Sequence, residues 1–452
     1  MKSLISRLKN NNIIKGAFII SVGGLTAKIL GALYRIPLTN ILGSNGIGLY
    51  QMAFPVYCIL LTFSSTGLPS GMAKLIAGGY DGKYTLKRSL KLFSAIGLVG
   101  TVLMLVFSYQ IARLQGEISA GICYVALSPS VFLVSVLSCF RGYFQGQSNM
   151  APTSVSQVTE QTVKLLFGLS LCYVFRNNIV MGAGLACLAV SSSEAVACLY
   201  IFSVYRKKRR AIIPEGKKIT ELKLIKTVFP ITLSAVMLPL AKVADSFLIV
   251  NFLKTYLNNA TSLYGIYTGG VESVTGVAVA VCYGVAVAIL PETSRLVAKN
   301  NFSEAEKKIR FSLLLTFGIS VITAVLTFLF ARPAVNFLYR GLSVENRNVM
   351  ALLLKTAAVS IVFLSLTQTG ASCLIAYGKL YTPCIGLGIG IILKTVFLVL
   401  TLKIPDINIF AAAISDILCY IVACFFNLVY IIIIARRRKA EYENNVDRLG
   451  SK

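Results

Sequence analysis

Apolar segments of roughly 18 to 28 residues recur along the whole chain, and this recurrence limits the possible folds more than any other feature. A helix of that length crosses about 30 Å of hydrocarbon and satisfies its backbone hydrogen bonds within itself. The chain has 452 residues, of which 56% are hydrophobic and 13% are charged. Such a composition is too apolar for a soluble protein of this length. The sequence therefore predicts an all-α integral membrane protein with many membrane-spanning helices.

About twelve membrane helices are predicted, in two lobes of six that a polar linker separates. The linker lies in the longest polar stretch, residues 205–226, which contains nine Lys and Arg residues that cannot lie in hydrocarbon. The predicted regions are the N-lobe 1–205, the basic cytoplasmic linker 206–223, the C-lobe 224–436 and the basic tail 437–452. The predicted helices are residues 13–38, 47–77, 88–110, 118–140, 152–175, 180–204, 224–253, 263–291, 308–331, 349–376, 384–402 and 408–435.

The distribution of positive charge predicts the orientation in the membrane, because cytoplasmic loops collect Lys and Arg. The N-terminus, residues 81–91, the linker, residues 295–310 and the tail are all rich in these residues, and the loops between them carry little charge, with residues 332–347 as one exception. A multi-pass protein of the cytoplasmic membrane with both termini in the cytoplasm follows. The net charge of +27 lies mainly in these short loops, which argues against nucleic-acid binding.

The two halves of the chain resemble each other, which indicates an internal repeat of six helices. The Leu-Tyr pair at residues 49–50 matches the pair at 263–264, and the Ala-Lys pair at 27–28 matches the pair at 241–242 at the same offset. Because six is even, both halves enter the membrane in the same sense. The predicted pseudo-twofold axis therefore runs along the membrane normal, and a cavity between the two lobes is the expected site.

Cationic side chains within the predicted helices are the sharpest candidates for binding, because a charge inside the membrane is costly and usually functional. Lys28 and Lys242 are related by the repeat, as are Lys164 and Lys394, and Arg35 lies near the expected outer mouth. These residues are predicted to bind an anionic group such as a phosphate or pyrophosphate headgroup. In the alternative, some of these lysines reach the membrane interface or pair with a nearby acid.

Acidic side chains within the predicted helices are candidates for coupling transport to an ion. Two of them lie close to a candidate lysine, so they can instead neutralise it: one is four residues before Lys164 and the other three residues after Lys242. Packing against polar neighbours is the structural alternative for the others. The candidates for binding a proton or Na⁺ are Glu160, Glu194, Asp245, Glu272 and Asp416.

Several kinds of chemistry are not expected from this sequence. The chain has no His, and its 11 Cys are scattered within apolar segments, so neither a metal centre nor a disulfide framework is predicted. The chain contains no phosphate-binding loop with the pattern G-x-x-x-x-G-K-[ST]. We therefore expect no enzymatic activity and no cofactor, with any transport coupled to a proton, to Na⁺ or to the membrane potential.

Residues 23–78 contain the segments AKILG, YRIPLTNILG, GIGLYQMAFPVY and GLPSGMAKLIA, and they resemble the opening of the stage V sporulation protein B family. That family of exporters of polysaccharides and lipid-linked oligosaccharides belongs to the multidrug/oligosaccharidyl-lipid/polysaccharide (MOP) flippase superfamily and is similar to the bacterial lipid II flippases. The resemblance implies two lobes that open alternately to each side of the membrane. In the lipid II flippases an Arg of the first helix has an essential role, and Lys28 occupies its place here.

Three functions are consistent with these features. The resemblance implies a flippase that exports an undecaprenyl-pyrophosphate-linked oligosaccharide or peptidoglycan precursor, with membrane lipids and cell-wall synthesis proteins as further partners. A cation-coupled multidrug antiporter of the same superfamily is the alternative, and it predicts a cavity in which Asp245, Glu272 or Glu194 dominates. A scaffold for cell-wall synthesis or spore assembly is the third, and it predicts that changes to the lysines are silent.

Overall fold

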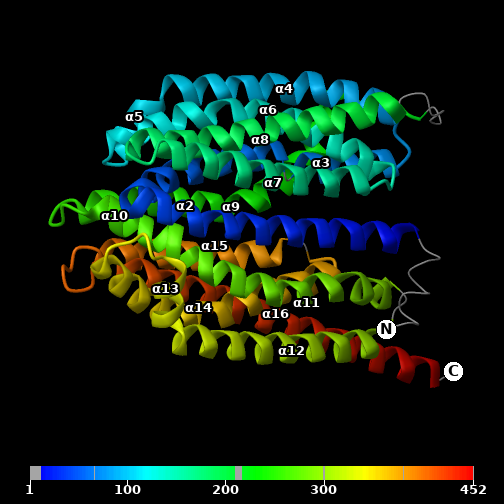
Figure 1. Ribbon diagram of the computed structural model, residues 1–452. Coiled ribbons are helices and arrows are strands. Elements are labelled where there is room, and N and C mark those ends of the chain that lie inside the picture. Colours follow the sequence, from blue (N-terminus) through cyan, green and yellow to red (C-terminus); the bar gives the residue numbers. More distant parts are fainter. Residues whose placement is uncertain (1–11, 66, 209–215, 299–300, 380, 451–452) are drawn as a thin grey trace. The chain divides into compact units, whose positions relative to one another are not determined.

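The computed structural model describes residues 12–65, 67–208, 216–298, 301–379 and 381–450, and nearly all of them are helical (Figure 1). Within these ranges the chain forms no β-strand, and one isolated β-bridge joins Tyr80 to Lys217. The elements are α2 (Asn12–Ser65), α3 (Gly67–Ala77), α4 (Gly82–Val106), α5 (Ser108–Leu114), η1 (Ile118–Ala120), α6 (Gly121–Gly146), α7 (Ala151–Val174), α8 (Ile179–Lys208), α9 (Glu221–Leu253), α10 (Ala260–Gly265), η2 (Ile266–Val271), α11 (Glu272–Ala298), α12 (Phe302–Leu329), α13 (Ala331–Leu338), α14 (Val344–Ala376), α15 (Thr382–Thr401) and α16 (Phe410–Gly450).

The predicted class, an all-α membrane protein, is confirmed, because ten helices of the described chain are long and apolar enough to cross a membrane. Two features explain why ten are found where about twelve were predicted. The first two predicted segments are counted as one candidate span, Ile29–Ala77, which runs from α2 into α3. The fifth forms α7 but is not among the ten, and the N-terminal half of α7 is rich in Ser, Thr and Gln.

Helix α2 has 54 residues, which at 1.5 Å per residue gives about 81 Å, more than twice the thickness of the hydrocarbon. It is divided at Gly43, whose backbone angles (φ 68°, ψ −177°) are not helical. Glycine adopts a positive φ without a steric penalty. The division falls between the predicted spans 13–38 and 47–77, so residues 12–42 correspond to the first span and residues 44–65, together with α3, to the second.

The described chain divides into two compact units. Unit 1 comprises residues 1–270 together with 338–346, and unit 2 comprises residues 271–337 together with 347–452. Unit 1 therefore includes α9 and α10, which the sequence repeat assigns to the second half. The division into lobes at the linker 206–223 rests on the repeat, and it stays a prediction.

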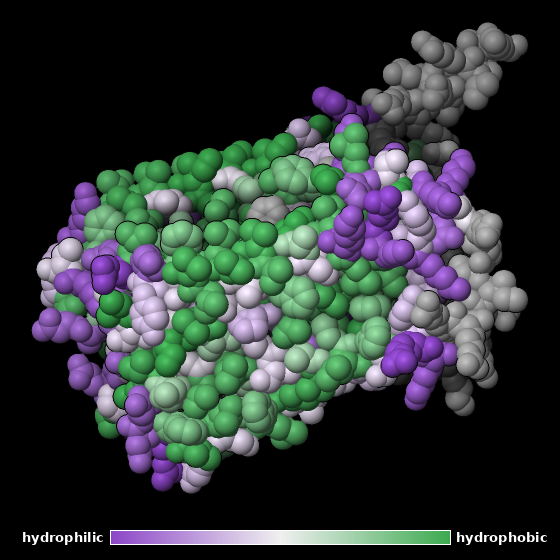
Figure 2. Space-filling view, turned by 90° about the horizontal axis from the view of Figure 1, so that it is seen from above, coloured by the Kyte–Doolittle hydropathy of each residue, from purple (hydrophilic) through white to green (hydrophobic). Residues whose placement is uncertain are grey.

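In unit 1, α6 packs against α4 and α8, and α7 packs against α8 and α2 (Figure 1). A cluster of buried apolar side chains from these helices, including Leu86, Leu137 and Phe144, forms the core near the end of the bundle where α4 begins and α6 ends. Figure 2 shows apolar side chains over the middle of this face and hydrophilic ones gathered toward its two ends. This is the surface pattern of a protein whose middle lies in lipid.

Backbone hydrogen bonds join the C-terminal part of the linker to the loop between α3 and α4. The Lys217 amide donates to the Gly79 carbonyl over 3.1 Å, and the Asp81 amide donates to the Lys217 carbonyl over 3.1 Å. Close by, Arg88 of α4 pairs with Glu221 of α9 at 2.7 Å. These contacts fix the N-terminal end of α9 against the loop between α3 and α4.

Unit 2 contains two pairs of helices that pack closely, α11 with α12 and α15 with α16. The second pair is a helical hairpin whose helices approach closely at Gly390, where a Cβ atom would lie 2.6 Å from the Cys419 carbonyl oxygen. Only glycine leaves room for this approach. One turn further along α15, Lys394 is held against α16 as a result.

Candidate functional site: a polar network in unit 1

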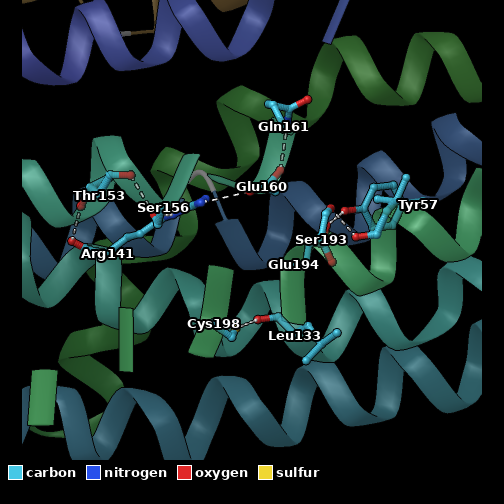
Figure 3. A network of polar contacts seen from close by, with 11 residues as sticks. Tyr57, Leu133, Arg141, Thr153, Ser156, Glu160, Gln161, Ser193, Glu194 and Cys198 are labelled. Carbon is cyan, nitrogen blue, oxygen red and sulfur yellow. Dashed lines mark hydrogen bonds and ion pairs between the residues drawn. The ribbon is translucent and has the colours of Figure 1, made fainter. Parts of the chain in front are cut away.

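A network of polar side chains joins α6 to α7 within unit 1 (Figure 3). Arg141 of α6 pairs with the Glu160 carboxylate at 3.0 Å, and its Nε donates to the Ser156 hydroxyl over 2.9 Å. The second Glu160 oxygen accepts from the Gln161 amide over 3.1 Å. Both oxygens of Glu160 therefore have a donor, so the carboxylate is fully engaged by this network.

A second acidic group lies beside the first. Glu194 of α8 is fully buried, and the Tyr57 hydroxyl of α2 donates to its Oε1. Its Oε2 has no hydrogen-bond partner among the described residues. A buried carboxyl oxygen without a donor is costly to keep ionised. A proton or a small cation bound there would offset this cost, which is the role predicted for Glu194, and that role stays a prediction.

Two cations of the same unit rest on aromatic rings. The Lys164 ammonium of α7 lies 5.6 Å from the centre of the Tyr34 ring, and the Arg35 guanidinium of α2 lies 5.6 Å from the centre of the Phe54 ring. Ring faces attract cations at this range. Within the described residues neither cation forms an ion pair with an acid. The charges of Glu160, Glu194 and Arg35 all act on Lys164, so these groups form one electrostatic cluster.

Lys394 and Asp416, which were predicted to have separate roles, lie together in unit 2. The Lys394 ammonium donates to the Asp416 carboxylate over 2.5 Å, and the two side chains are 3% and 7% exposed. The pair joins α15 to α16. Each group neutralises the other inside the helical hairpin.

The remaining predicted residues are more dispersed. Lys242 lies 3.7 Å from Asp245 on the same side of α9, as the spacing of three residues indicated. Glu272 begins α11 and is partly exposed. Lys28 lies in α2, but its side chain is outside the part of the structure that is described. The binding and coupling roles proposed for these residues stay predictions.

Several members of the network, among them Arg141, Tyr57 and Gln161, were not predicted from the sequence. Arg141 was placed after the end of a helix at residue 140, whereas α6 continues to Gly146. The segment 141–146 contains no proline, which was the available signal for a longer helix. Tyr57 and Gln161 carried no such signal, because a Tyr or Gln in an apolar helix is common and its partner depends on the tertiary fold.

Comparison with known proteins finds a matching family and several relatives. The family model described as polysaccharide biosynthesis protein matches residues 13–297, more than half of the chain, and the MatE model matches residues 230–400. The chain is 24% identical to the lipid II flippase MurJ of Bacillus subtilis (strain 168), over 93% of this chain and 83% of that protein. It is 28% identical to stage V sporulation protein B of the same organism, over 72% of this chain and 66% of that protein.

The structure is similar to an inward-facing conformation of a multidrug resistance MATE family transporter of the MOP superfamily. The TM-score is 0.73 at 16% identity, and the match covers 92% of this chain and 96% of the other. At that identity the likeness shows a shared fold. The match of the family model over more than half of the chain shows descent. The chain therefore belongs to the polysaccharide biosynthesis protein family.

Proposed function

We propose that this protein is a flippase that moves a lipid-linked oligosaccharide or peptidoglycan precursor, carried on undecaprenyl pyrophosphate, outward across the cytoplasmic membrane. Two relatives support the proposal by name, a lipid II flippase and a sporulation protein. In this proposal both termini are cytoplasmic and the protein has no enzymatic activity. Membrane lipids surround it, and cell-wall synthesis proteins are its further partners.

One observation carries the proposal: unit 1 holds more cationic than anionic charge at a partly buried site. The Arg141–Glu160 pair is neutral, and the two remaining cations, Arg35 and Lys164, outnumber the one remaining acid of the cluster, Glu194. A pyrophosphate offers several acceptor oxygens, which suit the planar donors of Arg and the point charge of Lys. Arg35 and Lys164 are therefore the residues to test first.

Lys28, Lys242 and Lys394 are proposed as further headgroup contacts. Lys394 is the weakest of these candidates, since it must leave the buried Asp416 carboxylate before it can bind a ligand. Lys242 must likewise compete with Asp245, although the ion pair is longer and the lysine more exposed. The order of importance we propose is Arg35 and Lys164, then Lys28 and Lys242, then Lys394.

The driving force we propose is the membrane potential, assisted by an ion bound at an acidic residue. An inside-negative potential favours the outward movement of an anion, by about 2.3 kcal/mol per charge at 100 mV. Among the acids, Glu194 is the first candidate, because Glu160 is engaged by Arg141 and Asp416 by Lys394. Asp245 and Glu272 remain the other candidates.

A second function, cation-coupled multidrug export, is favoured by a different observation. The unpartnered Oε2 of Glu194 is a site where a proton or cation can bind, and the MatE model matches residues 230–400. In that case cationic dyes are the substrates, and Glu194 is more important than Lys164. Dye accumulation in cells with and without the protein separates the two functions.

The test is the amount of lipid-linked precursor in the inner leaflet after this protein is depleted from its native cells. Accumulation is expected, and wild-type protein is expected to reverse it. The Arg35→Gln/Lys164→Gln double variant is expected to transport at least about tenfold less, since losing about 1.4 kcal/mol of binding lowers affinity tenfold.

The matched control is Lys307→Gln, which removes a cation that is 72% exposed and pairs only locally with Glu304. Full rescue is expected from this variant. Full rescue by a well-expressed Arg35→Gln/Lys164→Gln protein contradicts a cationic substrate site and favours a scaffold. No accumulation on depletion, together with dye retention, favours the multidrug function.

A further inference from the structure

We infer that Arg141 is a positioning residue, which binds Glu160 and so keeps the Lys164 ammonium available to an anionic ligand. The inference rests on the proposed function, because it assigns a role within the same site. Arg141 itself is not required to touch the ligand. Its role is to decide which cation the Glu160 carboxylate neutralises.

The sequence alone favours a different pairing. Glu160 and Lys164 are four residues apart on α7, with the acid nearer the N-terminus, which is the spacing and order that stabilise an ion pair on a helix. Such a pair would cancel the charge of Lys164. In the structure the Glu160 carboxylate is bound by Arg141 at 3.0 Å and by Gln161 at 3.1 Å, and Lys164 rests over Tyr34 instead.

Hydrogen bonds to α7 fix the position of Arg141. Its Nε donates to the Ser156 hydroxyl over 2.9 Å, and its backbone carbonyl accepts from the Thr153 hydroxyl over 3.4 Å. The side chains of Arg141 and Glu160 are only 11% and 20% exposed, so water competes weakly for either charge. The guanidinium is therefore fixed where it can bind Glu160 through a charge-assisted hydrogen bond.

The charges of Arg141, Glu160 and Lys164 predict how strongly each variant binds an anionic ligand. With Arg141 present, the Arg141–Glu160 pair is neutral and Lys164 contributes one positive charge. Without Arg141, Glu160 can pair with Lys164, which lies four residues further along the same helix and on which its charge already acts, so Lys164 is neutralised and the ligand loses its cation. When Glu160 is also removed, Lys164 is available again. The loss caused by Arg141→Gln should thus be reversed by Glu160→Gln.

The test is equilibrium binding of undecaprenyl pyrophosphate to the full-length protein in phosphatidylcholine nanodiscs, with undecaprenol as the uncharged probe. We expect Arg141→Gln to weaken binding of the pyrophosphate about tenfold, equal to about 1.4 kcal/mol, and the Arg141→Gln/Glu160→Gln double variant to return to within about threefold of wild type. Glu160→Gln alone should bind at least as tightly as wild type. Lys164→Gln should bind weakly in every background.

The matched control is the Arg88→Gln/Glu221→Gln variant, which removes the ion pair between α4 and α9 that lies outside the network, and its binding should equal that of wild type. If Arg141→Gln and the double variant are equally impaired, Arg141 is merely structural and the inference is wrong. If Arg141→Gln does not fold, the double variant is compared with wild type. Binding by the double variant that is more than threefold weaker than that of wild type then overturns the inference.

Failure of the proposed function has a different signature. In that case wild-type protein binds undecaprenyl pyrophosphate no more tightly than undecaprenol, whatever the variants do. A wild-type preference for the pyrophosphate with no reversal by Glu160→Gln leaves the function standing and removes only the role of Arg141.

Discussion

Unit 1 and unit 2 treat their buried charges in different ways. In unit 2, Lys394 and Asp416 form a pair that is nearly inaccessible to water and neutral by itself. In unit 1, Arg141 and Glu160 also cancel, but Lys164 and Arg35 are left without an acid partner among the described residues. A charge inside a membrane protein is therefore evidence for ligand binding only after its partners have been identified.

The largest expected effect is on the stability of unit 2. Lys394→Ala leaves the Asp416 carboxylate buried without its cation, and breaking a buried pair in this way costs about 3–5 kcal/mol. The measurement is thermal unfolding of the purified protein in detergent. The comparison with unit 1 predicts that Lys164→Ala has a much smaller effect, because no acid loses its partner.

The control for this prediction removes both charges. Lys394→Leu/Asp416→Leu should be far more stable than Lys394→Ala, since replacing a buried pair by apolar groups is often neutral. A double variant as unstable as the single one contradicts a simple ion-pair role. If Lys164→Ala is as damaging as Lys394→Ala, the contrast between the two units fails.

The helical architecture was largely predictable, because each apolar segment that the sequence shows lies in a helix. The exact number of crossings was not. The turn at Gly43 occupies a single residue in a continuous helical element, so the predicted loop has almost no length. The polar half of α7 lowers its hydropathy, and a helix of this kind is identified by its neighbours in the bundle rather than by its own composition.

The ion pairs formed by the candidate residues were less predictable than the helices, although the sequence did contain a sign of the Lys394–Asp416 pair. Lys394 lies eight residues before the C-cap of α15, and Asp416 lies six residues after the start of α16, so the two are at similar depth in a helical hairpin. Their contact could have been predicted from this spacing. The choice of Glu160 between Lys164 and Arg141 could not, because it depends on how α6 packs beside α7. Helical spacing predicts Lys164 as the partner of Glu160, whereas the packing of the helices makes Arg141 its partner.

A smaller effect is expected at an ion pair of unit 1 that lies outside the membrane-spanning segments. Glu117 pairs with Lys254 at 2.8 Å, and the Thr261 hydroxyl donates to the same carboxylate over 3.3 Å. Burial alone raises the pKa of Glu117, but the hydrogen bond and charge of Lys254, together with hydrogen bonds from Ser119, outweigh it and lower the pKa. The carboxylate therefore stays charged to a lower pH in the folded protein than in the unfolded chain.

The sign of the pH dependence follows from that lowered pKa. The stabilisation is complete above the unfolded pKa of about 4.3 and is lost as the pH falls through the lower folded value. Glu117→Gln should therefore be less stable than wild type at pH 7, by about 1 kcal/mol or less, because the pair is partly exposed. Unfolding of both proteins between pH 3 and 7 checks this, and a difference that persists unchanged at the acidic limit contradicts it.

The smallest effect is expected at Arg88 and Glu221, whose side chains are 39% and 46% exposed although their charged atoms approach to 2.7 Å. Water and salt screen such a pair, so Arg88→Gln should not measurably change thermal stability at physiological salt. The backbone hydrogen bonds between residues 79–81 and Lys217 hold this end of α9 without it. A loss of stability in Arg88→Gln comparable to that of Lys394→Ala would contradict the contrast between the two units. The short distance between the charged atoms, rather than burial, would then decide how much an ion pair contributes to stability.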